Sequence, residues 1–147
     1  MDEGRRKFCQ ASGLIVASSL LPVQAGCLGG GVQYYNGGPA SAVAMNEAIE
    51  VQIPDHFVYV CRDQNGLYAM TAYCTHMYCP VLFNSMQSGL PFGFQCNCHG
   101  STFDFGGQNP TAPATVPLTH FKLIVDTNGN LFIDPSTTVD PTERVKG

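Results

Sequence analysis

The sequence predicts an all-β protein, a small antiparallel β-sandwich or barrel preceded by an N-terminal signal or anchor segment. Short apolar segments alternate with turn residues, and no helical period of apolar residues stands out after residue 45. The chain of 147 residues contains 16 glycines and 10 prolines but no tryptophan, a composition typical of a small, loop-rich β protein. Its length fits one domain with a short appendage.

The predicted strands are short and lie between turn residues. Residues 47–53 alternate apolar and polar side chains, as expected of a half-buried strand. Asp63–Gly66 is predicted to be a turn between two further strands, and Asn128–Gly129 the turn of a hairpin. The other strands are expected at residues 57–61, 67–73, 92–94, 102–105, 121–126 and 131–134.

Composition divides the chain into four parts. Residues 1–27 are the expected signal or anchor, and residues 28–44, rich in glycine and small side chains, are the expected linker. The folded domain is expected at residues 45–135, followed by a C-terminal tail at residues 136–147.

The N-terminal segment has the pattern of an export signal. The basic block Arg5-Arg6-Lys7 precedes thirteen apolar or small residues at 11–23. The paired arginines resemble the twin-arginine type of signal. We therefore expect export, with the rest of the chain on the periplasmic side of the membrane. The alternative is a buried N-terminal helix that contains these arginines by chance.

The residues leave three fates of this segment open. It is cleaved after Ala25, it is retained as a membrane anchor, or it ends at a lipidated Cys27. A membrane-spanning helix needs about 20 apolar residues, and Pro22 makes a long span less favourable. The sequence therefore does not decide between a tethered and a soluble domain.

The charge balance argues against nucleic acid as a partner. Only 12% of the residues are charged, and the formal net charge is −4. Three of the seven basic residues lie in the first ten positions, so the rest of the chain has no basic patch for a phosphate backbone. The negative charge instead predicts a basic docking surface on a protein partner, and interaction rates that fall with added salt.

Two short segments concentrate cysteine and histidine. Residues 74–79 read CTHMYC and residues 96–101 read CNCHGS, so each segment offers one Cys and one His at short spacing and a second Cys. A zinc site with two Cys and two His is one interpretation, but it leaves two cysteines unused. Disulfides alone leave both histidines unused, and a haem attachment site has a different spacing. A mixed-ligand [2Fe–2S] cluster together with one disulfide uses every residue.

These two motifs resemble those of the Rieske iron–sulfur proteins, and the resemblance covers roughly residues 47–134. It implies a cluster-binding subdomain with one [2Fe–2S] cluster, in which Cys74 and Cys96 bind one iron and His76 and His99 bind the other. Two imidazoles in place of two thiolates leave the oxidised cluster uncharged, which raises its reduction potential to about −150 to +300 mV.

The resemblance also assigns roles to residues around the ligands. It implies a disulfide between Cys79 and Cys98, and such a bond requires an oxidising compartment, in agreement with export. Ser101 matches the serine that donates a hydrogen bond to a cluster sulfide. Residues 106–114 resemble the proline-bearing loop that covers the cluster.

Two departures from the family pattern bear on function. Phe103 stands where high-potential members have a tyrosine that donates to a ligand sulfur, so we expect a potential below that of quinol-oxidising relatives. Met77 and Tyr78 stand where the respiratory pattern has Leu-Gly, beside the histidine at which a quinol docks. This larger surface puts quinol oxidation in doubt.

The resemblance implies one-electron transfer by a protein that is not catalytic alone. The first hypothesis is the iron–sulfur subunit of a membrane-associated, quinol-oxidising cytochrome bc-type complex or a close relative. The second is an electron-relay subunit or carrier for another periplasmic oxidoreductase, like the small subunit of arsenite oxidase. The third is a structural zinc-binding module. In the first two, the partner is a redox protein, either a cytochrome or a larger oxidoreductase subunit.

The remaining candidate residues are given structural roles. His56 and His120 lie at strand starts, far in sequence from the motifs, and we expect ordinary surface or core histidines. Cys61 lies in an apolar strand and is expected to be a buried free thiol, with pairing to Cys9 or Cys27 left open. No Ser/His/Asp or paired-carboxylate arrangement stands out, so the residues give no support for hydrolysis and predict no catalytic residue.

Overall fold

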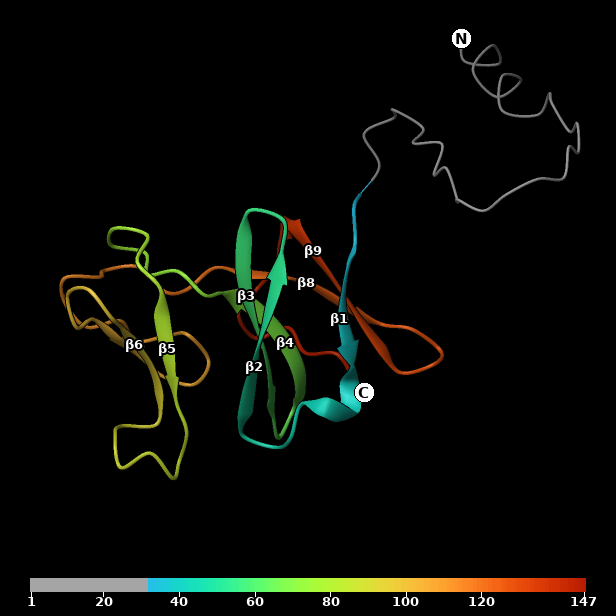
Figure 1. The fold of residues 1–147 in the computed structure, drawn as a ribbon, viewed down its shortest axis with the longest axis horizontal. Helices are drawn as coiled ribbons and strands as arrows, with labels where there is room; N and C mark the ends of the chain where they lie inside the picture. Colours follow the sequence, from blue (N-terminus) through green and yellow to red (C-terminus); the bar gives the residue numbers. More distant parts are fainter. Residues whose placement is uncertain (1–31) are drawn as a thin grey trace, which may run out of the picture. The chain divides into compact units, whose positions relative to one another are not determined.

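The computed structural model describes residues 32–147, which form two antiparallel sheets (Figure 1). The larger sheet has six strands in the order β1-β9-β8-β4-β3-β2, and the smaller has three in the order β5-β6-β7. Apart from one 3-10 turn, η1 (Ala40–Ala42), the regular elements of this part are all strands, so the predicted all-β class is confirmed. The strands are β1 (Tyr35–Pro39), β2 (Glu47–Ile53), β3 (His56–Asp63), β4 (Gly66–Thr71), β5 (Val81–Asn84), β6 (Gly93–Cys96), β7 (Thr102–Phe103), β8 (His120–Val125) and β9 (Asn130–Thr138).

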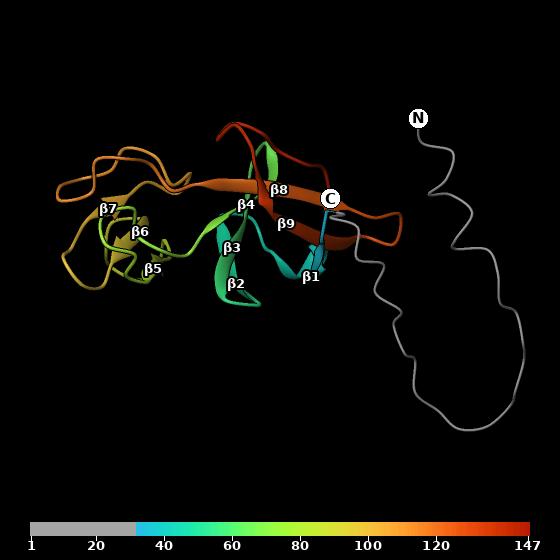
Figure 2. The same ribbon diagram turned by 90° about the horizontal axis from the view of Figure 1, so that it is seen from above.

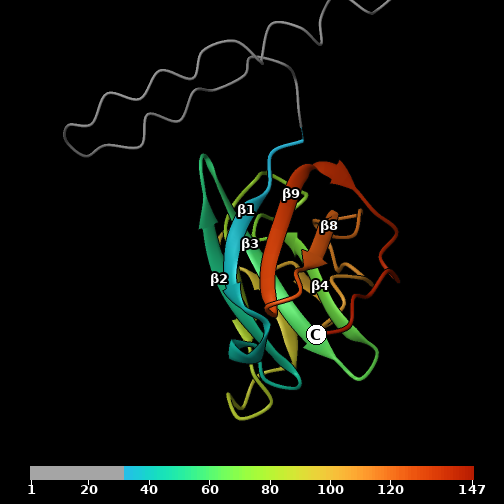
Figure 3. The same ribbon diagram turned by 90° about the vertical axis from the view of Figure 1, so that its right-hand side faces the viewer.

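The larger sheet curls until its edge strands β1 and β2 approach each other, which makes it nearly a barrel (Figure 3). Alternation along the strands places one face inside, and β-branched and aliphatic side chains fill it. Val58, Val60, Leu131 and Ile133 are fully buried there. Arg62 fastens the turn between β1 and β2 by donating to the Ala40 and Val43 carbonyls at 2.9 and 2.8 Å.

The smaller sheet packs beside the larger one through a second apolar core (Figure 2). Two tyrosines of the larger sheet cross this junction: the Tyr59 hydroxyl donates to the Val81 carbonyl at 3.1 Å, and the Tyr68 hydroxyl donates to the Phe105 carbonyl at 2.7 Å. The Tyr59 ring also lies 5.0 Å from the Phe94 ring. Burial raises the pKa of Tyr59 to about 12, so its phenol stays a proton donor at physiological pH.

The folded part begins earlier and ends later than composition suggests. Residues 35–39, inside the expected linker, form β1 and pair with β9. Beyond β9, inside the expected tail, Val145 exchanges two backbone hydrogen bonds with Leu67 of β4, at 2.8 and 2.9 Å. Backbone pairing with strands of the larger sheet therefore holds both segments in place, whatever their own side-chain pattern.

The predicted signal or anchor at residues 1–27, including Cys9 and Cys27, lies outside the described residues. Within residues 32–147, no helix has the length and apolar character needed to cross a membrane.

Candidate metal centre

The two cysteine–histidine segments fold into loops with the same backbone hydrogen bonds. In the first loop (residues 74–79), the Cys74 N–H donates to the Cys79 carbonyl at 2.7 Å, and the Tyr78 N–H donates back to Cys74 at 2.9 Å. In the second loop (residues 96–101), the Cys96 N–H donates to Ser101 at 2.7 Å, and the Gly100 N–H donates back to Cys96 at 3.2 Å. Each six-residue motif thus closes on itself and holds its first cysteine at the base.

The fifth residue of each loop adopts a left-handed backbone. Gly100 has φ +77°, and Tyr78, at the matching position of the first loop, has φ 58°. Glycine adopts this conformation without steric cost, whereas a residue with a Cβ is strained there by about 1–2 kcal/mol. The sequence therefore places a strained tyrosine where the loop geometry favours glycine.

The four predicted ligand side chains lie as two pairs. Cys74 and Cys96 are buried, with 1% and 2% of their surface exposed, and each thiol affects the pKa of the other. His76 and His99 are exposed, and their ring centroids are 5.0 Å apart. Within the described chain, no three His, Cys, Asp or Glu side chains are grouped tightly enough to hold a single metal ion.

The buried sulfurs differ in their electrostatic surroundings. Burial raises the pKa of Cys74, and the neighbouring Cys96 raises it further, against the His76 N–H and the Ser101 hydroxyl, which lower it. Burial acts in the same direction on Cys96, but the His99 and Cys98 N–H groups and the Cys74 thiol hold its pKa below the ordinary value. Backbone donors thus surround both sulfurs. Two buried sulfurs that accept hydrogen bonds and two exposed imidazoles form a donor set that could hold a pair of iron ions.

The two loops are joined directly. Cys79 of the first loop and Cys98 of the second form a disulfide. The Asn97 N–H also donates to the Pro80 carbonyl at 3.1 Å. These links fix the separation of the loops, and with it the spacing within each ligand pair, because each pair has one member in each loop.

A third segment, residues 106–117, covers the side of the two loops. The Ala114 N–H donates to the Ser101 hydroxyl oxygen at 2.9 Å, and the Thr75 hydroxyl donates to the Val116 carbonyl at 2.6 Å. Ser101 is fully buried, and its hydroxyl lowers the pKa of Cys74. Sequence reasoning singled out Ser101 but gave no signal for the contact made by Thr75.

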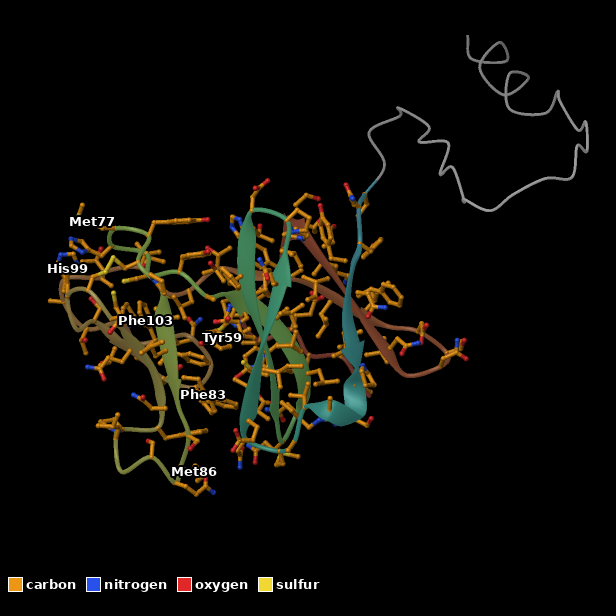
Figure 4. The ribbon with its side chains drawn as sticks, viewed as in Figure 1. Tyr59, Met77, Phe83, Met86, His99 and Phe103 are labelled. Carbon is orange, nitrogen blue, oxygen red and sulfur yellow. A yellow bond between two sulfur atoms is a disulfide. The ribbon has the colours of Figure 1, made fainter. Side chains whose placement is uncertain are left out.

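The surroundings of the loops are apolar and uncharged. Phe103 is buried in the same core as Cys74 and Cys96 and brings no hydroxyl to it. Met77 is 66% exposed at the tip, and Figure 4 shows it at the same end of the subdomain as His99, opposite Met86. Residues 64–103 and 105–121 contain no Asp, Glu, Lys or Arg. The net negative charge therefore lies outside the three segments that form this tip.

The side chains expected to be structural, His56, His120 and Cys61, differ in their surroundings. His56 accepts a hydrogen bond from the Tyr78 hydroxyl at 2.8 Å, a contact that sequence separation concealed. His120 is buried at the junction of the sheets, where burial lowers its pKa, and no described residue forms a hydrogen bond with its Nε2. Cys61 is buried and has no disulfide partner among residues 32–147, while the alternative partners Cys9 and Cys27 lie outside that range; burial raises its pKa.

Comparison with known proteins identifies the family. Residues 33–122 match the Rieske [2Fe-2S] domain family. The cytochrome b6-f complex iron-sulfur subunit of Synechococcus sp. strain CC9605 is 33% identical over 87 residues, which span 59% of this chain and 46% of that subunit. The corresponding subunit of Synechococcus elongatus strain PCC 7942 is 27% identical over an alignment 164 residues long, gaps included, that covers 93% of this chain and 87% of the relative.

Solved structures share the fold. A plasma membrane Rieske protein from the cyanobacterium Synechocystis PCC 6803 superposes with a TM-score of 0.54 at 24% identity, covering 68% of this chain and 98% of that chain. The ferredoxin of carbazole 1,9a-dioxygenase from Nocardioides aromaticivorans IC177 superposes with a TM-score of 0.51 at 19% identity, covering 69% and 97%. The chain spans about half the length of the subunit from strain CC9605.

Proposed function

The chain belongs to the Rieske [2Fe-2S] domain family, and from this premise we propose that it is the iron–sulfur subunit of a quinol-oxidising cytochrome bc-type complex or a close relative of one. The coarser function follows from the family: the domain carries a Rieske [2Fe-2S] cluster and transfers electrons. The zinc-module alternative is therefore set aside. The names of the relatives, iron-sulfur subunits of cytochrome b6-f complexes, support the choice of a quinol-linked complex.

We assign Cys74 and Cys96 to one iron and His76 and His99 to the other. The observation that carries this assignment is the separation of the ligands by depth, with two adjacent sulfurs buried and two adjacent imidazoles exposed. When bound, the cluster supplies one-electron transfer at a potential between about −150 and +300 mV. The chain's own residues orient the sulfurs through backbone N–H groups and exclude water from them.

The exposed imidazoles mark the surface at which the redox partner approaches. The loops that carry His76 and His99 also expose the Met77 and Tyr78 side chains, and they hold no Asp, Glu, Lys or Arg. An uncharged, partly apolar tip fits a partner surface of the same kind. The net charge predicted a basic docking surface on the partner, but the tip of this domain offers no acidic patch for such a surface to contact.

A second candidate function is an electron relay for another periplasmic oxidoreductase, such as an arsenite-oxidase-like small subunit. The observation in its favour is the first loop, where the exposed Met77 and Tyr78 replace the smaller Leu-Gly of the respiratory pattern. A protein partner tolerates this bulk better than a quinol headgroup that must reach His76. Both candidates place the domain on the periplasmic side of a membrane, and the Cys79–Cys98 disulfide supports an oxidising location.

Cluster content tests the ligand assignment. Reconstitution with iron and sulfide is expected to give two irons per chain and the visible and EPR spectra of a histidine-ligated cluster. Single Ser or Ala variants at Cys74, His76, Cys96 and His99 are expected to lose that spectrum, because each removes an iron ligand. The matched control is Cys61→Ala, a buried cysteine outside the loops, which should keep both irons. Retention of the native spectrum by any of the four variants overturns the assignment.

Isolation of the native assembly separates the two candidate functions. The full chain, with an affinity tag at its C-terminus, is purified from detergent-solubilised membranes of its own organism. Co-purification of a b-type cytochrome subunit and reduction of the cluster by a quinol support the bc-type role. Co-purification of a molybdenum-containing subunit, without quinol reactivity, replaces it with the relay role.

A further inference from the structure

Tyr78 is the residue of the first loop whose side chain contacts both Tyr73 and His56. Its ring stacks on Tyr73 with centroids 4.5 Å apart and planes at 4°, and its hydroxyl lies 2.8 Å from Nε2 of His56. His56 is the first residue of β3 in the larger sheet, and Tyr73 lies two residues beyond the end of β4, just before the first loop. The Tyr78 side chain thus reaches out of the loop onto a different part of the fold.

The direction of the hydrogen bond follows from the other nitrogen of His56. Nδ1 lies 2.9 Å from the Asp55 carbonyl oxygen, which can only accept. Nδ1 therefore carries the proton of the neutral ring, Nε2 presents a lone pair, and the Tyr78 hydroxyl donates to it. The imidazole is held at one nitrogen by its own backbone neighbour and at the other by Tyr78.

The other links of the first loop run to its neighbouring loops. Cys79 is bonded to Cys98, and Thr75 donates to Val116 of the covering segment. These links hold the three segments to one another, while the Tyr59 and Tyr68 hydroxyls fasten the smaller sheet to the larger one at points outside the first loop. Among the side chains of residues 74–79, Tyr78 supplies the hydrogen bond to that sheet.

Backbone strain indicates that this contact has an energetic role. The matching residue of the second loop is Gly100, and the space around it would admit a Cβ, so φ is what disfavours a side chain there. A tyrosine at φ 58° gives up stability that a glycine would keep. The stack and the hydrogen bond are the contacts that offset this loss.

We propose that Tyr78 is a positioning residue: together with His56 and Tyr73 it latches the first loop, and with it the His76 side chain, to the larger sheet independently of the disulfide. The loop contains two of the ligands proposed above, so this inference rests on the proposed site. Its first test uses the protein without metal, and its outcome does not depend on which residues bind iron.

The first test measures opening of the first loop by amide hydrogen exchange of residues 74–79. It uses the metal-free chain with Cys79→Ser and Cys98→Ser, so that the disulfide no longer holds the first loop and the contribution of the latch is measurable. Tyr78→Phe keeps the stack and loses the hydrogen bond, and exchange is expected to rise about fivefold. Tyr78→Gly loses both contacts, and exchange is expected to rise about tenfold or more even though the backbone strain is relieved.

The glycine variant decides between a latch and a tolerated substitution. If Tyr78 only occupies a position that glycine would fill better, Tyr78→Gly exchanges as slowly as the parent protein or more slowly, and the proposal is overturned. Tyr34→Phe is the matched control, since among the described residues no hydrogen-bond partner of the Tyr34 hydroxyl is found, and it should leave exchange unchanged.

A double-mutant cycle tests the Tyr78–His56 pair itself. His56→Leu removes the acceptor, so adding Tyr78→Phe to it should raise exchange by less than twofold, against about fivefold in the parent. His56→Gln keeps an oxygen that accepts the same bond and is expected to recover most of the protection. Additive effects of the two substitutions contradict the pairing.

The holoprotein provides a second readout, the rate at which the cluster is lost. With the disulfide intact, cluster loss in Tyr78→Phe should proceed within twofold of the parent rate. After reduction of the disulfide, the same variant should lose its cluster about fivefold faster, because the latch and the disulfide hold the loop in parallel. An equal rate in the variant and the parent after reduction overturns the positioning role.

Discussion

Phe103 lacks the hydroxyl group of a tyrosine, and this difference bears on the reduction potential of the site. It is buried in the same core as Cys74 and Cys96, opposite Phe94 in the ladder between β6 and β7. An aromatic ring fills the space but offers the sulfurs no proton. The reduced cluster would therefore lack one stabilising donor, and we expect its reduction potential to lie below that of relatives with a tyrosine there.

Phe103→Tyr is expected to raise the midpoint potential by about 40 mV. The added hydroxyl supplies one hydrogen bond worth about 1 kcal/mol, and one electron converts that energy to roughly this voltage. The measurement is a redox titration of the reconstituted protein followed by EPR. Phe83→Tyr, at the edge of the same core, is the control and should shift the potential by much less. An unchanged midpoint in Phe103→Tyr removes Phe103 as a determinant.

Arg144 stabilises the C-terminal segment against the larger sheet. Its Nε lies 2.7 Å from an Asp63 carboxylate oxygen, and its guanidinium lies 3.8 Å from the centre of the Tyr68 ring. Both partners are mostly shielded from water, which strengthens the pair relative to a surface salt bridge. Arg144→Ala is expected to reduce the free energy of unfolding by about 2 kcal/mol, measured by chemical denaturation.

Lys122 provides the comparison for this prediction. Its salt bridge to Glu143 is more exposed, with 38% of each side chain accessible, so Lys122→Ala should cost less than about 1 kcal/mol. Equal losses of unfolding free energy in the two variants would show that burial does not strengthen the Arg144–Asp63 pair.

At the scale of the elements, His120 at the start of β8 introduces a dependence on pH. Burial between the sheets lowers its pKa, and Arg144 adds to this effect, while the Leu118 carbonyl, Asp104 and Asp140 oppose it. The unfolded chain therefore binds a proton at a higher pH than the folded one. Stability contributed by the neutral ring is complete above about pH 6.5 and falls as the pH drops below that value.

His120→Asn is expected to flatten this acid dependence. The asparagine amide can still donate to the Leu118 carbonyl, which His120 Nδ1 contacts at 3.1 Å, but it does not titrate. The measurement is the midpoint of urea denaturation of the metal-free protein between pH 7.5 and pH 5, compared with the parent chain. An identical slope in both proteins would exclude His120 as the source.

The sequence predicted the elements with side-chain patterns better than those without. The alternating residues 47–53 coincide with β2, because the strand turns its apolar side chains toward the protein and its polar side chains toward solvent. The segments β1 and β5 were missed. Residues 35–39 read YNGGP and carry no apolar alternation, so only pairing with β9 makes them a strand. Residues 81–84 form a short strand between two loops, a length at which periodicity gives no signal.

The same distinction applies to the candidate site: the sequence pattern predicted its ligands but not all of its contacts. Ligand candidates could be recognised from the spacing within each motif, since the chemistry requires those residue types near one another. The contact between Tyr78 and His56 could not, because the two residues are 22 positions apart and neither belongs to a repeating pattern. Contacts that depend on how β3 passes the first loop appear only in three dimensions.

At the scale of the whole molecule, charge and electron-transfer site are separated. The chain carries a net charge of −4, yet residues 64–103 and 105–121, which include all three segments of the tip, hold no Asp, Glu, Lys or Arg. Long-range attraction of a partner depends on the field where it docks, and at physiological salt that field is screened beyond about 8 Å. Net charge is thus a poor guide to how this protein meets its partner.

Oxidation of the reduced protein by small ions of opposite charge measures the local field at the tip. Ferricyanide is anionic and hexaamminecobalt(III) is cationic, and the rate of each is expected to change less than threefold between low and physiological ionic strength. Asn97→Lys adds a charge to the exposed second loop and should make the ferricyanide rate fall steeply with salt. If the parent protein already shows strong salt effects of opposite sign for the two ions, charges outside the tip govern its encounters, and the uncharged docking surface has to be abandoned.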